Sequence, residues 1–216
     1  MVITKAAIFM HLPKTGGTWL QQVLADAVLR IEMHQPARYA PDDRPRFGFT
    51  RNPWSWYVSW YHFHAAGNYD NPVFQAAAAT HGDTFGQITY GLLTAPADLK
   101  RRAYKIAGHN TTGRNQGITQ ATIGRWIDTE DSYLTHLHTL HLEGCDRVGK
   151  AENIADDLSA MLEGIGALDD DTAARIRNTP PANTSKHSQP ADYYSPDLEA
   201  LVAEREADQI AAYNYG

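Results

Sequence analysis

The sequence predicts an α/β protein in which a single domain spans residues 1–216, with a mostly parallel central sheet flanked by helices. Three observations support this class. The chain is long enough to bury a core, strand-like apolar runs alternate with segments of helical periodicity, and residues 13–19 join the first apolar run (6–10) to a helical segment. Because ligands of such sheets bind at the carboxyl ends of strands, a site is expected in the loops there.

The stretch 13–19, which reads PKTGGTW, has the composition of a phosphate-loop-like connection between a strand and a helix. Gly16 and Gly17 let the backbone approach a ligand closely, and the N–H groups at a helix start favour an anion. Lys14 and two threonine hydroxyls add hydrogen-bond donors. The Walker pattern is absent, because Lys14 precedes the glycines. The alternative is a tight connection whose glycine pair serves only the turn.

The other elements follow from the same criteria in chain order. Apolar residues at i, i+3, i+4 and i+7 predict a helix over 20–31, and a short strand is expected to end at His34. A strand at 47–51 leads into a helix with Asn52 as N-cap and Pro53 at its first position. The remaining expected elements are helices at 72–79, 85–93, 154–165 and 196–213, a strand at 146–150, and loops at 109–117 and 178–190.

The helix that follows Asn52 carries a polar stripe. Asn52, Ser55, Ser59 and His62 are spaced i, i+3, i+7 and i+10, while the other positions are almost all aromatic or aliphatic. A helix that is apolar on most sides is a buried one, so a polar stripe on it must face a partner, a ligand or water. The alternative is that the stripe faces solvent. Arg51, at the end of the preceding strand, provides a second position suited to binding an anion, after the loop at 13–19.

Charge and cysteine content restrict the function. The formal net charge of −6 disfavours general binding to nucleic acid, so an anionic ligand needs a local cluster of cations. The basic run at 100–105 is interpreted as a solvated helix face. His136, His138 and His141 have no matching carboxylate or cysteine set, so they are interpreted as surface histidines and no metal site is predicted. Cys145, the single cysteine, allows no internal disulfide.

The N-terminal region contains Lys5 followed by a run of only about five apolar residues, too short for a signal sequence or a membrane span. We therefore expect no membrane span and a cytoplasmic location. The chain contains no internal repeat and no low-complexity linker.

Two motifs in this order resemble the sulfotransferases that use 3′-phosphoadenosine-5′-phosphosulfate (PAPS), in particular their bacterial and carbohydrate-type branches. Residues 13–19 resemble the 5′-phosphosulfate loop of this family, and Arg51 and Ser59, eight positions apart, resemble its 3′-phosphate motif. His34 lies between the two motifs, where these branches often carry a histidine. Residues 148–153 are similar to a closing segment of bacterial members.

The resemblance implies PAPS as cofactor, 3′,5′-adenosine bisphosphate as product, and no metal. Lys14 would be catalytic, because its ammonium would contact the oxygen that bridges phosphate and sulfate. Trp19 would pack on the adenine, and Lys186 would belong to a C-terminal loop that closes on the cofactor. The 5′-phosphate would be held by Thr15, Gly16, Gly17 and Thr18, and the 3′-phosphate by Arg51 and Ser59.

Transfer of a sulfuryl group to a hydroxyl requires a base that works near neutral pH, and histidine suits this task. His34 is the expected general base, and His62 on the polar stripe and Glu32 are the rivals. Because Glu32 and His34 lie on one face of an alternating strand, Glu32 would otherwise orient His34. His11, at the end of the first strand, is expected to be structural.

The acceptor has no recognisable motif, and the segment 67–144 is unassigned. A carbohydrate, a lipid, or a small phenol or alcohol would offer the hydroxyl, and an amine is a further option. Two other classes of function stay open. One is a nucleotide-kinase-like phosphate-loop enzyme, and the other is a module that binds a nucleotide or a sulfated ligand without catalysis.

Overall fold

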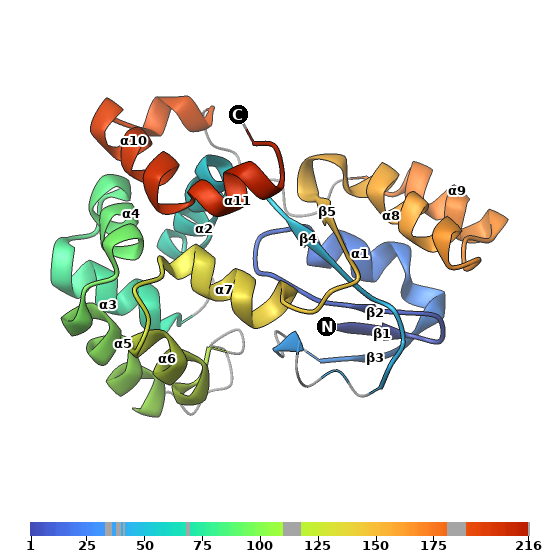
Figure 1. Ribbon diagram of the computed structural model, residues 1–216, viewed down its shortest axis with the longest axis horizontal. Coiled ribbons are helices and arrows are strands. Elements are labelled where there is room, and N and C mark those ends of the chain that lie inside the picture. Colours follow the sequence, from blue (N-terminus) through green and yellow to red (C-terminus); the bar gives the residue numbers. More distant parts are fainter. Residues whose placement is uncertain are drawn as a thin grey trace. The chain divides into compact units, whose positions relative to one another are not determined.

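The computed structural model describes residues 1–32, 36–37, 40, 42–67, 70–109, 118–180 and 189–215. The chain divides into two compact units, each formed from two separate stretches of sequence. Unit 1 comprises Met1–Arg51 and His138–Thr184, and unit 2 comprises Asn52–Leu137 and Ser185–Gly216. Strands and helices both contribute, so the α/β class is confirmed (Figure 1). The expectation of one domain over residues 1–216 stays a prediction.

The described part of unit 1 contains a five-stranded sheet with the order β3-β1-β2-β4-β5 (Figure 1). β2 pairs in parallel with β4, and β4 with β5, whereas β1 is antiparallel to both β2 and β3. As a consequence β2, β3, β4 and β5 have their carboxyl ends at the same edge. The strands are β1 (Val2–Thr4), β2 (Ile8–Phe9), β3 (Val28–Ile31), β4 (Arg46–Thr50) and β5 (Arg147–Lys150).

The sheet is mixed, so the expectation of a mostly parallel sheet needs correction at the β1 side. The reason is a tight turn between β1 and β2. The Thr4 hydroxyl donates to the Ala7 carbonyl at 2.9 Å and accepts from the Ala7 N–H at 3.0 Å. This turn reverses the chain within a few residues and makes the two strands antiparallel neighbours. The strands expected at 47–51 and 146–150 are confirmed as β4 and β5.

The segment after the first loop is shorter as a helix than its periodicity indicates. Helix α1 covers Gly17–Val23, a 3₁₀ turn follows at Ala25–Ala27, and Val28–Ile31 is β3. The expected helix over 20–31 is therefore wrong from residue 24 onward. Pairing with β1, in which Val2 lies opposite Ile31, overrides the helical spacing. His34 lies outside the described residues.

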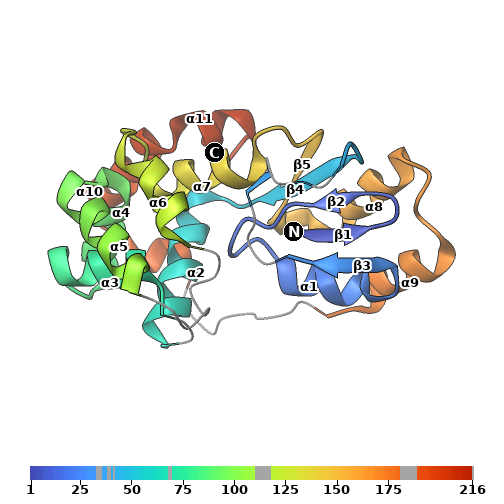
Figure 2. The same ribbon diagram turned by 90° about the horizontal axis from the view of Figure 1, so that it is seen from below.

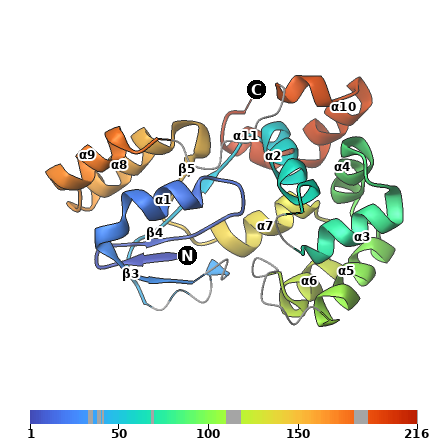
Figure 3. The same ribbon diagram turned by 180° about the vertical axis from the view of Figure 1, so that it is seen from behind.

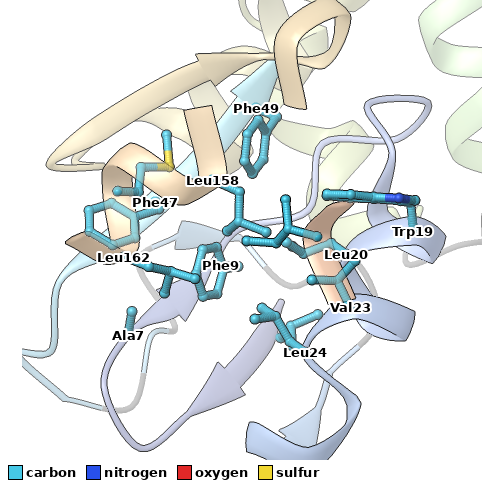
Figure 4. Packing of buried hydrophobic residues seen from close by; sticks show 13 residues of the cluster. Ala7, Phe9, Trp19, Leu20, Val23, Leu24, Phe47, Phe49, Leu158 and Leu162 are labelled. Atoms are coloured by element: carbon cyan, nitrogen blue, oxygen red, sulfur yellow. The ribbon is translucent and has the colours of Figure 1, made fainter. Parts of the chain in front are cut away.

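Three helices of unit 1 share an apolar core with the sheet, and Figure 4 shows its central residues. Leu20 and Val23 of α1 pack with Phe9 of β2 and with Leu158 of α8. Burial of side chains of this size stabilises by about 1.5–3 kcal/mol each, so α1 is fixed directly after the loop. In Figure 3, α1 and α8 lie side by side over the sheet. The other two helices are α8 (Ile154–Gly164), close to the expected 154–165, and α9 (Asp170–Asn178), which was not expected.

The described part of unit 2 is helical (Figure 2). α3 packs against α4 and α5, α5 against α6, and α10 against α2 and α4. The expected helix at 196–213 is broken near Glu206 into α10 and α11. None of the described helices has the length and hydropathy of a membrane span. The helices are α2 (Pro53–Ala65), α3 (Pro72–His81), α4 (Phe85–Thr94), α5 (Ala97–His109), α6 (Gln120–Ile127), α7 (Tyr133–Leu142, whose second half belongs to unit 1), α10 (Pro196–Arg205) and α11 (Ala207–Ala212).

Aromatic side chains form the core of unit 2. Trp56 and Trp60, one turn apart on α2, stack with ring centroids 6.0 Å apart, and Tyr133 of α7 contacts Trp60 at 5.6 Å. Each of these rings is at most 2% exposed. The helix therefore is buried, as its composition predicts. Its start is confirmed as well, since the Asn52 side chain accepts from the Ser55 N–H and Pro53 occupies the first turn.

The three histidines of α7 are buried, which corrects their interpretation as surface residues. His136, His138 and His141 are 5%, 9% and 1% exposed. One face of α7 packs against α6, where His136 Nε2 lies 3.1 Å from the Thr122 carbonyl. Among the described residues no group of three side chains is arranged to hold a metal ion.

The basic run at 100–105 is exposed at Arg101, Arg102 and Lys105, as interpreted, and Lys100 is the exception. Lys100 is only 3% exposed. Its ammonium donates to the Thr129 carbonyl at 2.6 Å and lies 5.4 Å from the centre of the Trp126 ring. A carbonyl and an aromatic face together stabilise a partly desolvated cation, so this lysine connects α5 to the end of α6.

Candidate functional site

The loop between β2 and α1 is closed by its own hydrogen bonds. The Met10 N–H donates to the Phe47 carbonyl at 2.6 Å, which continues the pairing of β2 with β4. The Thr15 hydroxyl then donates to the Leu12 carbonyl at 2.7 Å and closes a short turn. Within this turn Lys14 has a φ of 69°, a left-handed conformation that costs a non-glycine residue about 1–2 kcal/mol. Such an outlier is typical of functional loops.

The two glycines of the loop are required for different reasons. Gly16 has a φ of 87°, and a Cβ there would stand 2.5 Å from Ile154 Cδ1 at the start of α8. A Cβ on Gly17 would stand 2.0 Å from His11 Nε2. Gly16 therefore serves both the turn and the packing on α8, whereas Gly17 makes room for the His11 ring.

Lys14 and Arg51 converge at the carboxyl edge of the sheet. Arg51, which follows β4, donates from Nη1 to the Lys14 carbonyl at 3.2 Å. Both side chains are half-buried. The pKa of Lys14 is lowered to about 8, first because burial disfavours its charge and second because the Arg51 guanidinium repels it. The local field at Lys14 is thus positive, which favours an anion.

Thr15 and Thr18, predicted to contact the 5′-phosphate, and Trp19, predicted to contact the adenine, have different surroundings. Thr15 is buried, and its hydroxyl proton is used in the bond to Leu12, whereas Thr18 is exposed. Trp19 is 5% exposed within the core of unit 1, and its indole N–H donates to the Thr179 carbonyl at 3.0 Å. The structure gives Trp19 a core role, and its contact with adenine stays a prediction.

Lys150 is a residue of this edge that sequence reasoning missed. It ends β5 and lies opposite Thr50 of β4 in the parallel register. Side chains at paired positions of neighbouring strands share a face, and on that face the Thr50 hydroxyl lies 3.2 Å from Nε2 of the buried His138. The signal was available, because a lysine ends a strand that was itself predicted at 146–150.

Ser59 and His62 lie on α2 in unit 2. Ser59 is 3% exposed, and the ring of the half-buried His62 meets Tyr193 edge-on, with centroids 5.0 Å apart. At the start of the polar stripe the Ser55 hydroxyl donates to the Asn52 carbonyl at 3.1 Å. Part of the stripe therefore caps the helix, and Ser59 and His62 are its inner members.

Glu32 lies at the carboxyl end of β3, at the same edge as the loop but separated from β2 by β1. Its carboxylate forms an ion pair with Arg30 of the same strand. An orienting role of Glu32 toward His34 stays a prediction, since His34 lies outside the described residues. Lys186 lies outside them too, and its role also stays a prediction.

Comparison of the chain with protein-family models, with curated proteins and with solved structures gave no match. The residues of the site are therefore the basis for inferring the function. The best-defined part of the site is the pair of cations Lys14 and Arg51, which follow β2 and β4.

Proposed function

We propose that this protein is a PAPS-dependent sulfotransferase, in which the phosphate-loop-like connection between β2 and α1 holds the 5′-phosphosulfate. The observation that carries the proposal is the convergence of Lys14 and Arg51, joined by the 3.2 Å bond from Arg51 to the Lys14 carbonyl. Both causes of the lowered pKa of Lys14 make this place unfavourable for the ammonium when no anion is bound. An anionic ligand would reverse that balance.

In the proposed reaction the bond between sulfur and the bridging oxygen of PAPS breaks, and a bond forms between sulfur and the acceptor oxygen. Negative charge develops on the leaving phosphate oxygen, as in phosphoryl transfer. The Lys14 ammonium would stabilise this charge. Removal of one comparable donor from an enzyme costs about 3–4 kcal/mol of transition-state stabilisation. Arg51 and Ser59 would hold the 3′-phosphate, and the loop residues Thr15 to Thr18 the 5′-phosphate.

The acceptor proton would pass to a base. We propose His34 for this role, with His62 as the first rival. Glu32 is the weaker rival, since its carboxylate already pairs with Arg30. The proposed chemistry requires no metal, because side-chain cations neutralise the phosphates. The acceptor would be a hydroxyl or an amine on a carbohydrate, a lipid, or a small phenol or alcohol.

Thermal unfolding with three nucleotides tests the proposal. At a concentration 100 times the dissociation constant, 3′,5′-adenosine bisphosphate should stabilise the protein by about 2.7 kcal/mol. AMP should stabilise it less, because it lacks the 3′-phosphate that Arg51 would bind. Stabilisation by ATP with Mg²⁺ but not by the bisphosphate would instead favour the kinase-like alternative and reject the sulfotransferase.

A transfer assay separates an enzyme from a binding module. Labelled PAPS is supplied with panels of carbohydrate, lipid, phenol and amine acceptors, and the label on the acceptor is measured. Transfer should disappear in Lys14→Met and His34→Ala, whereas bisphosphate binding should survive His34→Ala. Full transfer by His34→Ala would assign the base to His62 or Glu32. Bisphosphate binding without transfer to any acceptor would favour the non-catalytic module.

A further inference from the structure

The imidazole of His11 lies directly against Gly17, the first residue of α1. A Cβ on Gly17 would stand 2.0 Å from Nε2, 2.3 Å from Cδ2 and 2.4 Å from Cε1 of His11. Gly17 is not among the glycines with a positive φ. It is therefore the position of the ring, and not the backbone conformation, that requires glycine here.

The closed turn of the loop explains how His11 reaches this place. Pairing of β2 with β4 extends to Met10, so His11 is the first residue beyond the strand. The Thr15 hydroxyl bond to the Leu12 carbonyl then folds the chain back, and the left-handed Gly16 directs it into α1. The two ends of the loop meet as His11 and Gly17, with Lys14 between them in the sequence.

The position of the His11 ring relative to the loop and its chemistry suit it to contact an anion there. The His11 ring is only half-buried, and its far edge, with Nε2, lies on the side of Gly17. An imidazole N–H is a good donor to an oxyanion, and it gains a charge on protonation close to neutral pH.

We propose that His11 is a ligand-contacting residue of the anion site. Its imidazole donates a hydrogen bond to the 5′-phosphate group held beside Lys14, and residue 17 is glycine so that the ring fits. This assignment rests on the proposed function, and it gives His11 more than the structural role expected from the sequence. A purely structural His11 would fill the space beside α1 without affecting ligand affinity.

Isothermal titration with adenosine 5′-phosphate and adenosine 3′-phosphate tests the assignment. His11→Ala should weaken binding of the 5′-phosphate roughly tenfold or more, as expected for a lost hydrogen bond to a charged group, and should leave the 3′-phosphate unchanged. His11→Asn, which keeps a shorter donor, should bind the 5′-phosphate with intermediate affinity. Arg51→Ala is the matched control and should weaken mainly the 3′-phosphate.

A double-variant experiment tests the role assigned to Gly17. Gly17→Ala should lower the Tm, since its Cβ clashes with the ring, and adding His11→Ala should restore the Tm by removing the clash. Affinity for the 5′-phosphate should stay low in the double variant. A Tm that His11→Ala does not restore would show that the ring is not the reason for glycine.

The outcomes separate this assignment from the proposed function. If the wild type binds both nucleotides and His11→Ala binds them equally well, the assignment of His11 is overturned and the sulfotransferase proposal stands. If the wild type binds neither nucleotide, the anion site itself is rejected, and the assignment of His11 with it.

Discussion

In unit 1 the ammonium of Lys14 is half-buried beside the guanidinium of Arg51, whereas in unit 2 the buried carboxylate of Glu206 is surrounded by hydrogen-bond donors. The Tyr57 hydroxyl donates to Oε1 of Glu206 at 2.6 Å. The Thr135 hydroxyl and the Gln209 amide donate to Oε2 at 2.9 and 3.1 Å. These donors connect α2, α7 and α11, so the carboxylate serves the packing of three helices.

The difference separates a structural charge from a functional one. Burial raises the pKa of Glu206, but the hydroxyl donors around it act in the opposite direction and support the charge. For Lys14, burial and Arg51 act in the same direction against the charge. A cation that a neighbouring cation repels is typical of a site that an anionic ligand completes. Four experiments test this difference between Lys14 and Glu206 and between the two units.

The largest expected effect is a loss of stability at acidic pH. Each of the two units contains a histidine that is buried in its neutral form. Burial lowers the pKa of His138 in unit 1 to about 3 and that of His136 in unit 2 to about 4. Below pH 6.5 these histidines bind protons in the unfolded chain but not in the folded chain. The free energy of unfolding therefore decreases by about 1 kcal/mol per histidine for each unit by which the pH is lowered. Urea unfolding between pH 7 and pH 4 measures this slope.

His138→Gln keeps a donor near Thr50 and removes one titrating ring, so it should make the dependence on pH about half as steep. His136→Gln should do the same from unit 2. Equal flattening by both variants indicates that the units unfold together. An unchanged slope in either variant would contradict the neutral buried state of that histidine.

The second effect is a gain of stability with a loss of binding in Lys14→Met. Methionine keeps the length and the Cβ of the side chain but removes the charge. Because the pKa of Lys14 is lowered from 10.5 to about 8, its charge lowers the stability at pH 7, and the variant should gain up to about 3 kcal/mol. Its affinity for 3′,5′-adenosine bisphosphate should fall about tenfold to 100-fold.

The dependence on pH checks the sign of the stability gain expected for Lys14→Met. The gain should vanish as the pH rises from 8 toward 10.5, where the wild-type lysine becomes neutral in the folded state and then in the unfolded state. Thermal unfolding at pH 7 and pH 10 compares the two conditions. A variant less stable than the wild type at pH 7 would remove the contrast with Glu206.

The third effect is a loss of stability in Tyr57→Phe. The variant removes the donor to Oε1 of a carboxylate that is 1% exposed, which should reduce the free energy of unfolding by about 1–3 kcal/mol. Tyr104→Phe, at a partly exposed ring of α5, is the matched control and should change it by less than about 0.5 kcal/mol. Equal effects of the two variants would argue against a structural role of the Glu206 cluster.

The smallest expected effect concerns Lys150, at the same edge of the sheet as Lys14 and Arg51. It tests whether the anion site extends to β5. Lys150 lies opposite Thr50, the residue before Arg51, so Lys150→Met should weaken bisphosphate binding by about 1 kcal/mol, or roughly fivefold. Lys105→Met removes an exposed lysine from α5 of unit 2 and should leave the affinity unchanged. Titration calorimetry at low salt measures both, and equal affinities would exclude Lys150 from the site.

Sequence reasoning located the elements whose signals are local. Asn52 and Pro53 mark the start of α2, the strand at 47–51 is β4, and the helices at 72–79 and 85–93 are α3 and α4. Helix caps, prolines and apolar spacing act within a few residues of the chain. The loop at 13–19 and the position of Arg51 at a strand end were found in the same way.

Other features were decided only by contacts between residues far apart in the sequence. Val28–Ile31 has helical spacing and becomes β3 by pairing with β1. The histidines of α7 and Lys100 look like surface residues and are buried, since packing between helices decides exposure. The contact between Arg51 and the Lys14 carbonyl spans 37 positions.

The residue pattern alone was enough to identify which residues bring charge and flexibility to the two strand ends. Folding was needed to bring the guanidinium of Arg51 close enough to disfavour the charge of Lys14, and to place the ring of His11 in the space beside Gly17. A pKa and a steric fit depend on distances in space, and spacing along the chain does not determine those distances.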